Sequence, residues 1–383
     1  MRNINVSSVT NLICHLIKKV KLDEEKNWRI INMSVNAGII GFGYMGHFHL
    51  NKIKQIEGIK VIAAFDNLEQ KLEEADKEGI KGYHTLEEFL AVEEMNLVII
   101  CTPNNWHSQY AIAALNAGKH VLCEKPATMS VVELEDIIRC SENNNKIFTV
   151  HQNRRWDVDY KIVRDVVENK MIGQITTIES KVFGERGVCF GWRADPVAGG
   201  GMLYDWGVHL IDQMLQLFAG QKVKSVHARI LSILTPVVDD YFEIEMIFDS
   251  GVCARVMVGT FALQKLPRWF VFGDRGTLKL DDFSGKTGGM ARIKGNVEGF
   301  DSVIGKKSLG PSRTMAPLES QHLEKLELPT AEEEPLTFWV NLVDSIENGT
   351  SQYVKSEEVM RQMKVVEAAF LSYKKNEVIK VCI

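Results

Sequence analysis

The sequence predicts a two-domain α/β protein. We expect an N-terminal domain built on a doubly wound parallel sheet and a C-terminal α+β domain built on a large, mainly antiparallel sheet. Short apolar runs alternate with helical segments between residues 35 and 150, and a glycine-rich turn follows the first run. After residue 157 the pattern changes to longer segments in which apolar and polar residues alternate. Crossover helices between strands indicate a parallel sheet, and alternation indicates half-buried strands.

Composition narrows the class of protein. The chain has 383 residues, of which 45% are hydrophobic and 25% charged, as is typical of globular proteins of two domains. A formal net charge of -5 gives no electrostatic reason to expect binding to nucleic acid or to a membrane. No segment approaches the roughly 18 apolar residues that a membrane span needs. A small-molecule partner is therefore expected.

The cysteines indicate the cellular compartment in which the protein is expected. Seven cysteines are scattered and never spaced as a Cys-x-x-Cys pair, which predicts reduced thiols in a cytoplasmic protein.

Residues 1–32 precede the globular pattern, which begins at Met33. They lack the order of a signal peptide. Our hypothesis is that they form a dispensable extension.

The first domain is predicted to span residues 33–156. Strands are expected near residues 35–40, 60–65, 97–101, 119–123 and 146–150. Helices are expected after the first two strands and near residues 108–116 and 131–142. This alternation is typical of repeated βαβ units.

The second domain is predicted to span residues 157–383. After a helix that ends near residue 170, strands are expected near residues 174–183, 223–234, 241–248, 252–261 and 268–280. A glycine-rich segment and a helix interrupt them at 199–218. Residues 281–334 are polar and rich in glycine, so we expect a long loop there. Helices are predicted within 336–375, near 336–348 and 357–375.

A glycine motif follows the first strand. Gly41, Gly43 and Gly46, with Tyr44 and Met45 between the last two, open the first helix. Backbone N–H groups at a helix N-terminus can bind a pyrophosphate where glycine leaves room. The alternative is a structural turn, but the βαβ setting favours a Rossmann dinucleotide-binding domain.

Asp66 ends the second strand, twenty residues after Gly46. A carboxylate there accepts hydrogen bonds from the adenosine ribose and repels a 2′-phosphate. Asn67 and Leu68 supply no cation to offset that repulsion. We therefore expect NAD rather than NADP, with a helix N-cap as the alternative role for Asp66.

Two further strands end in polar residues. Thr102, Pro103 and Asn104 follow one strand, and Glu124 and Lys125 follow the next. Ligands of open α/β sheets bind at the carboxyl ends of strands, so the nicotinamide is expected here. Thr102 and Asn104 taken alone are compatible with a plain turn. Lys125 is the strongest candidate because its charge must face a crevice, a carboxylate or solvent.

A second group of candidates follows three glycines at 199–201. Asp205, His209 and Asp212 have the spacing of one face of a single helix. Oxidation of an alcohol requires a group that accepts the hydroxyl proton, and neutral histidine does so near neutral pH. A lone histidine is usually structural. The nearby carboxylate, glycines and aromatic residues favour a functional role.

The segment that leaves the first domain supplies candidates for substrate contact. These are Asn153, Arg155 and Asp157, together with Trp192 and Arg193. An interdomain network of ion pairs is an equally good interpretation of these residues.

No metal site is predicted. His47 and His49 lie two positions apart in a helix, where they cannot share a face.

These motifs resemble those of the glucose-fructose oxidoreductase and inositol dehydrogenase family, Gfo/Idh/MocA. The resemblance spans residues 35–381 and rests on Thr-Pro-Asn-x-x-His ending at His107, on the Glu-Lys-Pro segment at 124–126, and on the Gly-Gly-Gly-x-x-x-Asp-x-x-x-His segment at 199–209. It implies that Lys125 positions nicotinamide and substrate, His209 exchanges the proton and Asp205 orients the pair. It also implies that an open C-terminal sheet mediates homodimers or homotetramers.

The sequence therefore predicts an NAD-dependent dehydrogenase of a polyol or sugar alcohol. Two alternatives remain: glycoside cleavage through transient oxidation by a bound NAD, and a cofactor-binding sensor without catalytic activity.

Overall fold

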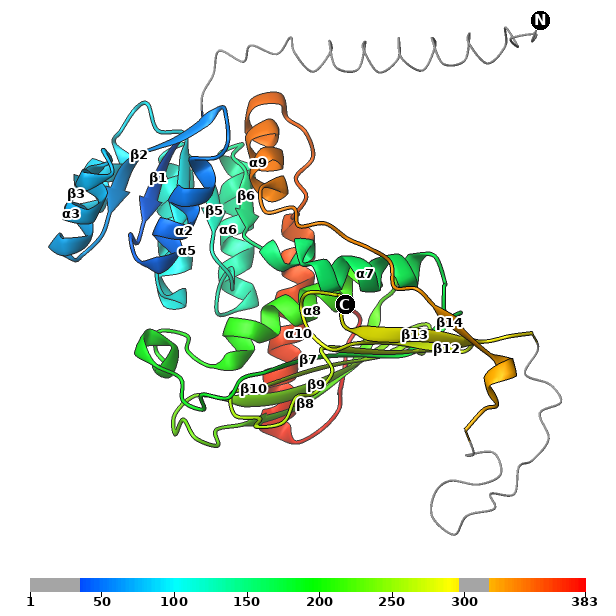
Figure 1. Ribbon diagram of the computed structural model, residues 1–383. Helices are drawn as coiled ribbons and strands as arrows, with labels where there is room; N and C mark the ends of the chain where they lie inside the picture. Colours follow the sequence, from blue (N-terminus) through cyan, green and yellow to red (C-terminus); the bar gives the residue numbers. More distant parts are fainter. Residues whose placement is uncertain (1–34, 296–316) are drawn as a thin grey trace, which may run out of the picture.

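The computed structural model describes residues 35–295 and 317–383, which fold around two sheets (Figure 1). The hypothesis about residues 1–32 lies outside the described residues. Helix α9 is distant in sequence from the first sheet and yet packs against its central strand β1. Within the described ranges, no helix is both long enough and apolar enough to cross a membrane.

The first sheet has six parallel strands in the order β3-β2-β1-β4-β5-β6. The strands are β1 (Val35–Ile40), β2 (Ile59–Phe65), β3 (Lys81–Tyr83), β4 (Leu97–Ile100), β5 (His120–Cys123) and β6 (Phe148–Val150). The chain runs outward from β1 in one direction and from β4 in the other. This reversal creates a crevice at the carboxyl ends of β1 and β4, where ligands of such sheets bind.

Helices cover this sheet, and the composition of its strands reflects that. All four residues of β4 are buried and apolar, as expected of a strand covered on both faces. The helices are α2 (Tyr44–Ile53), α3 (Glu69–Lys77), α4 (Leu86–Leu90), α5 (His107–Asn116), α6 (Val131–Asn143) and α9 (Thr337–Asn348). The predicted doubly wound parallel sheet is confirmed.

The second sheet has nine strands in the order β14-β13-β12-β11-β7-β10-β9-β8-β15. Among the described strands of this sheet, only β7 and β10 pair in parallel. The strands are β7 (Ile175–Phe183), β8 (Val223–Leu231), β9 (Tyr241–Phe248), β10 (Cys253–Gly259), β11 (Trp269–Gly273), β12 (Gly276–Leu280), β13 (Gly288–Ile293), β14 (Leu323–Leu326) and β15 (Ile379–Lys380). The predicted mainly antiparallel sheet is confirmed.

One face of this sheet packs on helices. Burial alternates strictly along β9, which is the pattern of a strand with one buried face. The covering helices are α7 (Val158–Glu168), α8 (Val208–Leu217) and α10 (Ser356–Lys375). In Figure 1 the long α10 runs from the first sheet to the second, and it contacts both α6 and β8. One helix thus fixes the relative position of the two domains.

Two details differ from the prediction. The tract 281–334, expected to be a loop, contains β13, β14 and a short 3-10 turn at Ser320–His322. The prediction failed because these strands bury few side chains: Met290 is the one buried residue of β13, and β14 has none. The expected strand at 268–280 is a hairpin of β11 and β12.

Candidate active site

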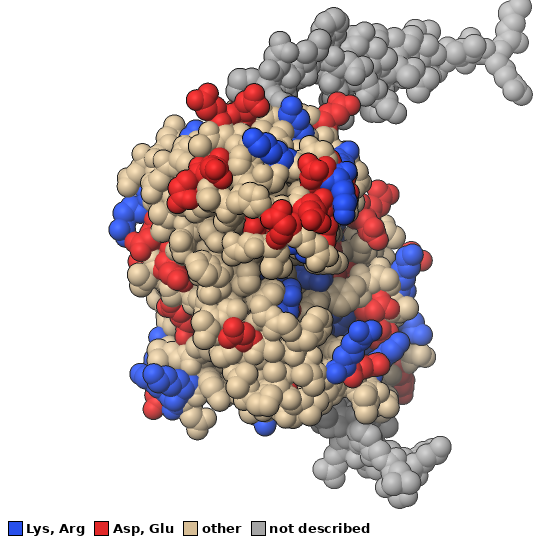
Figure 2. Space-filling view, turned by 90° about the vertical axis from the view of Figure 1, so that its left-hand side faces the viewer, with Lys and Arg blue, Asp and Glu red and all other residues tan. Residues whose placement is uncertain are grey.

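A cleft of about 610 Å³ lies between the carboxyl edge of the first sheet and the glycine-rich segment of the second domain. Residues from both domains line it, from Gly41 at one end to His209 at the other. Figure 2 views the molecule from the side on which the 185–200 loop lies, and Lys and Arg atoms are visible in a central hollow of that face. The volume of the cleft lies within the range of small-molecule binding sites.

The glycine loop fits a pyrophosphate. Gly41 has a φ of +88°, a conformation that side chains rarely adopt, and a Cβ there would lie 2.9 Å from the carbonyl oxygen of Cys101. A Cβ at Gly46 would lie 2.6 Å from the carbonyl oxygen of Gly41. Gly43 faces open space and is the N-cap of α2. The helix N-terminus is thus accessible to an anion through a gap that a side chain at Gly43 would narrow.

Asp66 fastens this loop to the end of β2. Its Oδ2 accepts a hydrogen bond from the backbone N–H of Phe42 at 2.8 Å, and its Oδ1 accepts one from Leu68 at 2.9 Å. Helix α3 begins at Glu69 with Leu68 as its N-cap, so Asp66 is not the helix cap. Asp66 also lines the cleft, where its carboxylate remains able to accept ribose hydroxyls.

Sequence reasoning missed a cation at this end of the cleft. Lys71 lines the cleft with Asp66, Asn67 and Leu68. Its Nζ lies 2.6 Å from Oε2 of Glu74, so part of its charge is already compensated. The sequence carried a signal that could have identified Lys71, because this residue lies in the first turn of the helix that follows Asp66.

The loop after β4 forms the middle of the cleft. Thr102, Pro103 and Asn104 all line it, as predicted from their place at the strand end. The hydroxyl of Thr102 is buried without a hydrogen-bond partner among the described residues. Asn104 donates from Nδ2 to the carbonyl oxygen of Gly199 at 2.7 Å. This bond ties the first domain to the glycine-rich segment of the second.

His107 joins two loops instead of lining the cleft. Its Nδ1 lies 2.7 Å from the carbonyl oxygen of Pro126, and its Nε2 lies 2.9 Å from that of Thr102. The ring is buried. His107 therefore holds the loop after β4 against the loop after β5. In this arrangement it supports the cofactor-binding residues and does not reach into the cleft itself.

Glu124 lies at the centre of a buried cluster. Its Oε1 is 2.8 Å from Nε2 of His49 and 2.9 Å from Nδ1 of His151, and its Oε2 accepts the backbone N–H of Lys125 at 3.2 Å. Burial would raise the pKa of Glu124, but His151 and His49 outweigh it and hold that pKa well below its usual value. The carboxylate therefore stays ionised and fixes the backbone that carries Lys125.

Lys125 and Asp205 meet across the cleft. Nζ of Lys125 donates to Oδ1 of Asp205 at 2.7 Å and to its backbone carbonyl oxygen at 2.9 Å. Nε of Arg193 lies 3.2 Å from the other carboxylate oxygen. Burial would raise the pKa of Asp205, but the charges of Lys125 and Arg193 lower it. The site thus contains two cations held by one carboxylate.

His209 stands beside this pair in an unusual helix. A π-helical turn, Leu203–Gly207, carries Asp205 and leads directly into α8, whose first turn carries His209. Such turns occur frequently at functional sites. Burial, together with the charges of Lys125 and Arg154, holds the pKa of His209 well below its usual value. Its Nδ1 is buried without a hydrogen-bond partner among the described residues, and the lowered pKa keeps the imidazole neutral near neutral pH.

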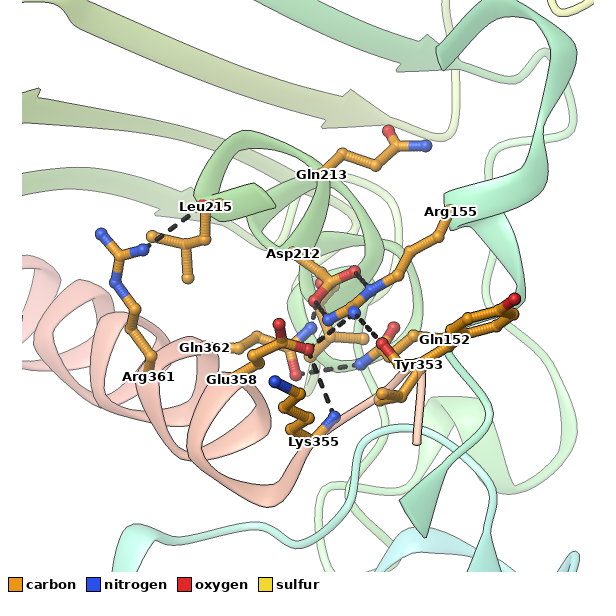
Figure 3. A network of polar contacts seen from close by, with 12 residues as sticks. Gln152, Arg155, Asp212, Gln213, Leu215, Tyr353, Lys355, Glu358, Arg361 and Gln362 are labelled. Atoms are coloured by element: carbon orange, nitrogen blue, oxygen red, sulfur yellow. Dashed lines mark hydrogen bonds and ion pairs between the residues drawn. The ribbon is translucent and has the colours of Figure 1, made fainter. Parts of the chain in front are cut away.

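Asp212 and Arg155 belong to a different structure (Figure 3). Both nitrogens at one edge of the Arg155 guanidinium bind the Asp212 carboxylate, at 2.6 and 2.7 Å, and the third binds Glu358 at 2.8 Å. Arg155 also bonds the carbonyl oxygen of Tyr353. The prediction placed Asp205, His209 and Asp212 on one face of a single helix, and the structure divides them. Asp205 in the π-helical turn and His209 in α8 line the cleft, whereas Asp212 binds Arg155 and does not line it. Arg155 joins α8 to α10 and does not line the cleft.

The other expected substrate contacts divide into two groups. Asn153, Trp192 and Arg193 line the same cleft as Lys125. Asp157 lies in a neighbouring cavity and binds Arg154 at 2.9 Å. The helix N-terminus and the cleft thus hold the predicted cofactor residues with the exception of His107.

His151, Arg154 and Trp206 are among the further residues that line the cleft, and none of them was singled out from the sequence as a site residue. His151 follows β6, so the rule that ligands bind at strand ends could have identified it. No pattern distinguishes Arg154 from Arg155, which are neighbours in one 3-10 turn.

The comparisons identify the family. Residues 35–152 match the Gfo/Idh/MocA family described as an oxidoreductase family with an NAD-binding Rossmann fold, and residues 160–279 match the C-terminal domain of that family. This chain belongs to the Gfo/Idh/MocA family. It is accordingly an NAD(P)-binding oxidoreductase.

Individual relatives of this Gfo/Idh/MocA protein agree with that assignment. The solved structure of an NAD-binding protein from Listeria innocua is 38% identical, covers 91% of this chain and all of its own, and has a TM-score of 0.86. Scyllo-inositol 2-dehydrogenase (NADP(+)) of Bacillus subtilis is 26% identical over 90% of this chain and 96% of its own length. An oxidoreductase of Schizosaccharomyces pombe is 28% identical over 77% of this chain and 83% of its own.

Proposed function

We propose that this protein is a dehydrogenase that transfers a hydride between NAD and a secondary alcohol of a polyol or sugar. The observation that carries the proposal is the contact of Lys125 with Asp205 beside a neutral His209. The nicotinamide, when bound, accepts or donates the hydride. The side chains then have to bind the hydroxyl and exchange its proton.

The three residues suit distinct roles. The ammonium of Lys125 can donate to the substrate oxygen and stabilise the negative charge that develops as the hydroxyl proton leaves. His209, neutral at neutral pH, can accept that proton. Asp205 holds Lys125 in place and balances its charge.

The choice of alcohol substrate rests on the relatives and on the cleft. Scyllo-inositol 2-dehydrogenase of Bacillus subtilis and myo-inositol 2-dehydrogenase of Thermotoga maritima are among the similar proteins. Besides Lys125, the cleft offers the amide of Asn153, the guanidinium of Arg193 and the indole of Trp192. These groups can bind several hydroxyls at once.

NAD is the proposed cofactor because Asp66 lines the ribose end of the cleft. The relative from Bacillus subtilis is described as using NADP(+), and Lys71 supplies a cation nearby. Relative kcat/KM values with NAD and NADP decide between them. Equal use of both would contradict the proposal.

We also propose that the second sheet mediates a homodimer or homotetramer. Its face away from the helices carries partly exposed apolar side chains such as Ile247 and Met257 between ion pairs such as Arg255 with Glu245. Mixed faces of this kind are common in protein interfaces. Sedimentation analysis of the full chain tests the proposal, and a monomer at micromolar concentration would contradict it.

A panel of inositols and sugars, read by nicotinamide absorbance, tests the activity. We expect turnover with at least one polyol or sugar and its loss in Lys125→Met. Release of an aglycone from glycosides without accumulation of NADH would indicate cleavage by transient oxidation instead. Cofactor binding without turnover of any member would favour a sensor.

A further inference from the structure

A second cavity adjoins the cleft. It has a volume of about 340 Å³ and shares His151, Asn153 and Arg154 with the cleft wall. We call it the outer cavity. Because three residues line both spaces, the two cavities abut at that wall. The catalytic residues Lys125, Asp205 and His209 line only the cleft, so the outer cavity begins where the reacting part of the substrate ends.

The side chain of Arg154 separates the two spaces. Its guanidinium carbon lies 4.0 Å from the ring centre of Trp206, which lines the cleft, and 5.5 Å from that of Phe283, which lines the outer cavity. Nη1 donates to Asp157 in the outer cavity at 2.9 Å. A guanidinium has five N–H donors, so Arg154 can bind hydroxyls on both sides of the partition.

The walls of the outer cavity suit a hydroxylated ring. Aromatic side chains come from separate parts of the chain: Phe48 from α2, Trp156 from the turn before α7, Phe283 from the turn after β12, and Phe338 from α9. The C–H faces of a sugar ring stack on such surfaces, while its hydroxyls need polar partners at the edge.

Polar partners are present at that edge. Lys52 lines the outer cavity, and its ammonium lies 5.6 Å from the centre of the Phe48 ring without a carboxylate partner within the described part of the chain. Asp157 supplies acceptor oxygens on the opposite element. Donors and acceptors thus surround an aromatic space, as hydroxyl recognition requires.

We propose that the outer cavity is a second sugar subsite, so that the preferred substrate is a glycosylated polyol or a disaccharide whose second ring binds beyond Arg154. This inference rests on the proposed function, since it extends the same substrate outward from the reacting carbon. The first ring lies against Lys125 and His209, and the glycosidic link passes Asn153 and Arg154, the residues that both cavities share.

Paired substrates test the subsite. We would measure kcat/KM of the holoenzyme for myo-inositol against α-D-galactosyl-myo-inositol, and for D-glucose against maltose. The expected result is a conjugate favoured over its parent by about tenfold, the gain typical of one aromatic stacking contact. The double variant Phe48→Leu, Lys52→Ala should reduce this ratio towards unity.

Lys54→Ala is the matched control. Lys54 follows the same helix but binds Glu78 at the surface, so its variant should keep the wild-type ratio. A wild-type ratio at or below one for both pairs would overturn the subsite, as would a ratio unchanged in the double variant.

The two proposals can fail separately. Turnover of myo-inositol or D-glucose without preference for the conjugates would overturn the proposed subsite and leave the proposed dehydrogenase activity intact. If no member of the panel is turned over, the proposed function fails. Calorimetry of maltose and D-glucose with the NAD-loaded protein then decides: tighter binding of maltose that the double variant loses supports the subsite, and equal or absent binding overturns it.

Discussion

The ammonium nitrogen of Lys125 lies 2.7 Å from a carboxylate oxygen of Asp205, although eighty positions separate the two residues in the chain. One follows β5 of the first domain, and the other lies in the π-helical turn of the second. The contact therefore joins the two domains at the floor of the cleft. Together with the bond from Asn104 to Gly199, this ion pair brings residues of the two domains into one site.

Removal of the Lys125 charge should affect catalysis far more than folding. We expect Lys125→Met to lower kcat/KM by about a hundredfold or more, because the donor that stabilises the developing alkoxide is lost. Asp205→Asn should lower it less, since an amide oxygen can still accept the Lys125 bond. Steady-state rates at saturating NAD measure both. A smaller loss in Lys125→Met than in Asp205→Asn would contradict the assigned roles.

The pH profile should reflect a depressed pKa of His209. A histidine neutral in the free enzyme accepts protons at every pH above its own pKa, so alcohol oxidation should not lose this base as pH falls through about 6.5, the ordinary value. Arg154→Gln removes one charge that lowers the pKa of His209, and its acid limb should move to higher pH. Profiles of kcat/KM from pH 5 to 9 test this. Superimposable acid limbs would count against the electrostatic account.

Cofactor choice should respond to two residues in opposite directions. Asp66→Ser removes the carboxylate that repels a 2′-phosphate, so the NADP to NAD ratio of kcat/KM should rise about tenfold or more. Lys71→Ala removes the nearby cation, and in an otherwise unchanged chain it should lower that ratio below the wild-type value. Lys71→Leu also lacks the cation but keeps side-chain bulk, so it should show the same ratio as Lys71→Ala and controls for lost packing. If Asp66→Ser left the NADP to NAD ratio of kcat/KM unchanged, Asp66 would not determine the choice of cofactor.

The network in Figure 3 predicts a loss of stability without a direct effect on chemistry. Arg155→Ala leaves the buried Asp212 carboxylate unpaired, which should cost about 3–5 kcal/mol of unfolding free energy. Urea unfolding measures it. Arg139→Ala, which removes an exposed pair with Asp136, is the control and should change little. If Arg155→Ala and Arg139→Ala had equal free energies of unfolding, the conclusion that Arg155 joins α8 to α10 would be refuted.

The fold and the two residues of the interdomain ion pair could be identified from the sequence because their signals are local. The apolar runs of β1 and β4 and the glycines after β1 identify a parallel sheet and its ligand-binding edge. Lys125 and Asp205 each lie in a short motif whose residue types have few structural uses. Such features require no knowledge of tertiary packing.

The remaining differences arise where tertiary context decides. Helical spacing placed Asp212 on the cleft face with Asp205 and His209, but Asp212 pairs with the buried Arg155 instead and does not line the cleft. Adjacent arginines in one 3-10 turn diverge, so Arg154 enters the cleft wall and Arg155 the interior. Strand β14 is held by its hydrogen bonds with β13 and not by burial, which leaves no hydrophobic pattern to read.

The ionised carboxylate of Glu124 stabilises the folded protein, and this stabilisation depends on pH. Its pKa in the folded protein lies well below the ordinary 4.5, so the contribution is complete above about 4.5 and is lost as pH falls through the lower, folded value. Glu124→Gln should therefore be less stable than the wild type by about 3 kcal/mol at pH 7, because two buried histidines lose their anionic partner.

The difference between Glu124→Gln and the wild type should shrink as the wild type itself becomes protonated. Urea unfolding at pH 7, 5 and 3.5 tests this, with Glu135→Gln on the exposed face of α6 as the control that should show no such trend. A constant difference at all three pH values would mean that Glu124 acts through packing alone. Because Oε2 of Glu124 also accepts the backbone N–H of Lys125, the variant should lower kcat as well as stability. A loss of stability with unchanged kcat would show that the Lys125 backbone is held by other contacts.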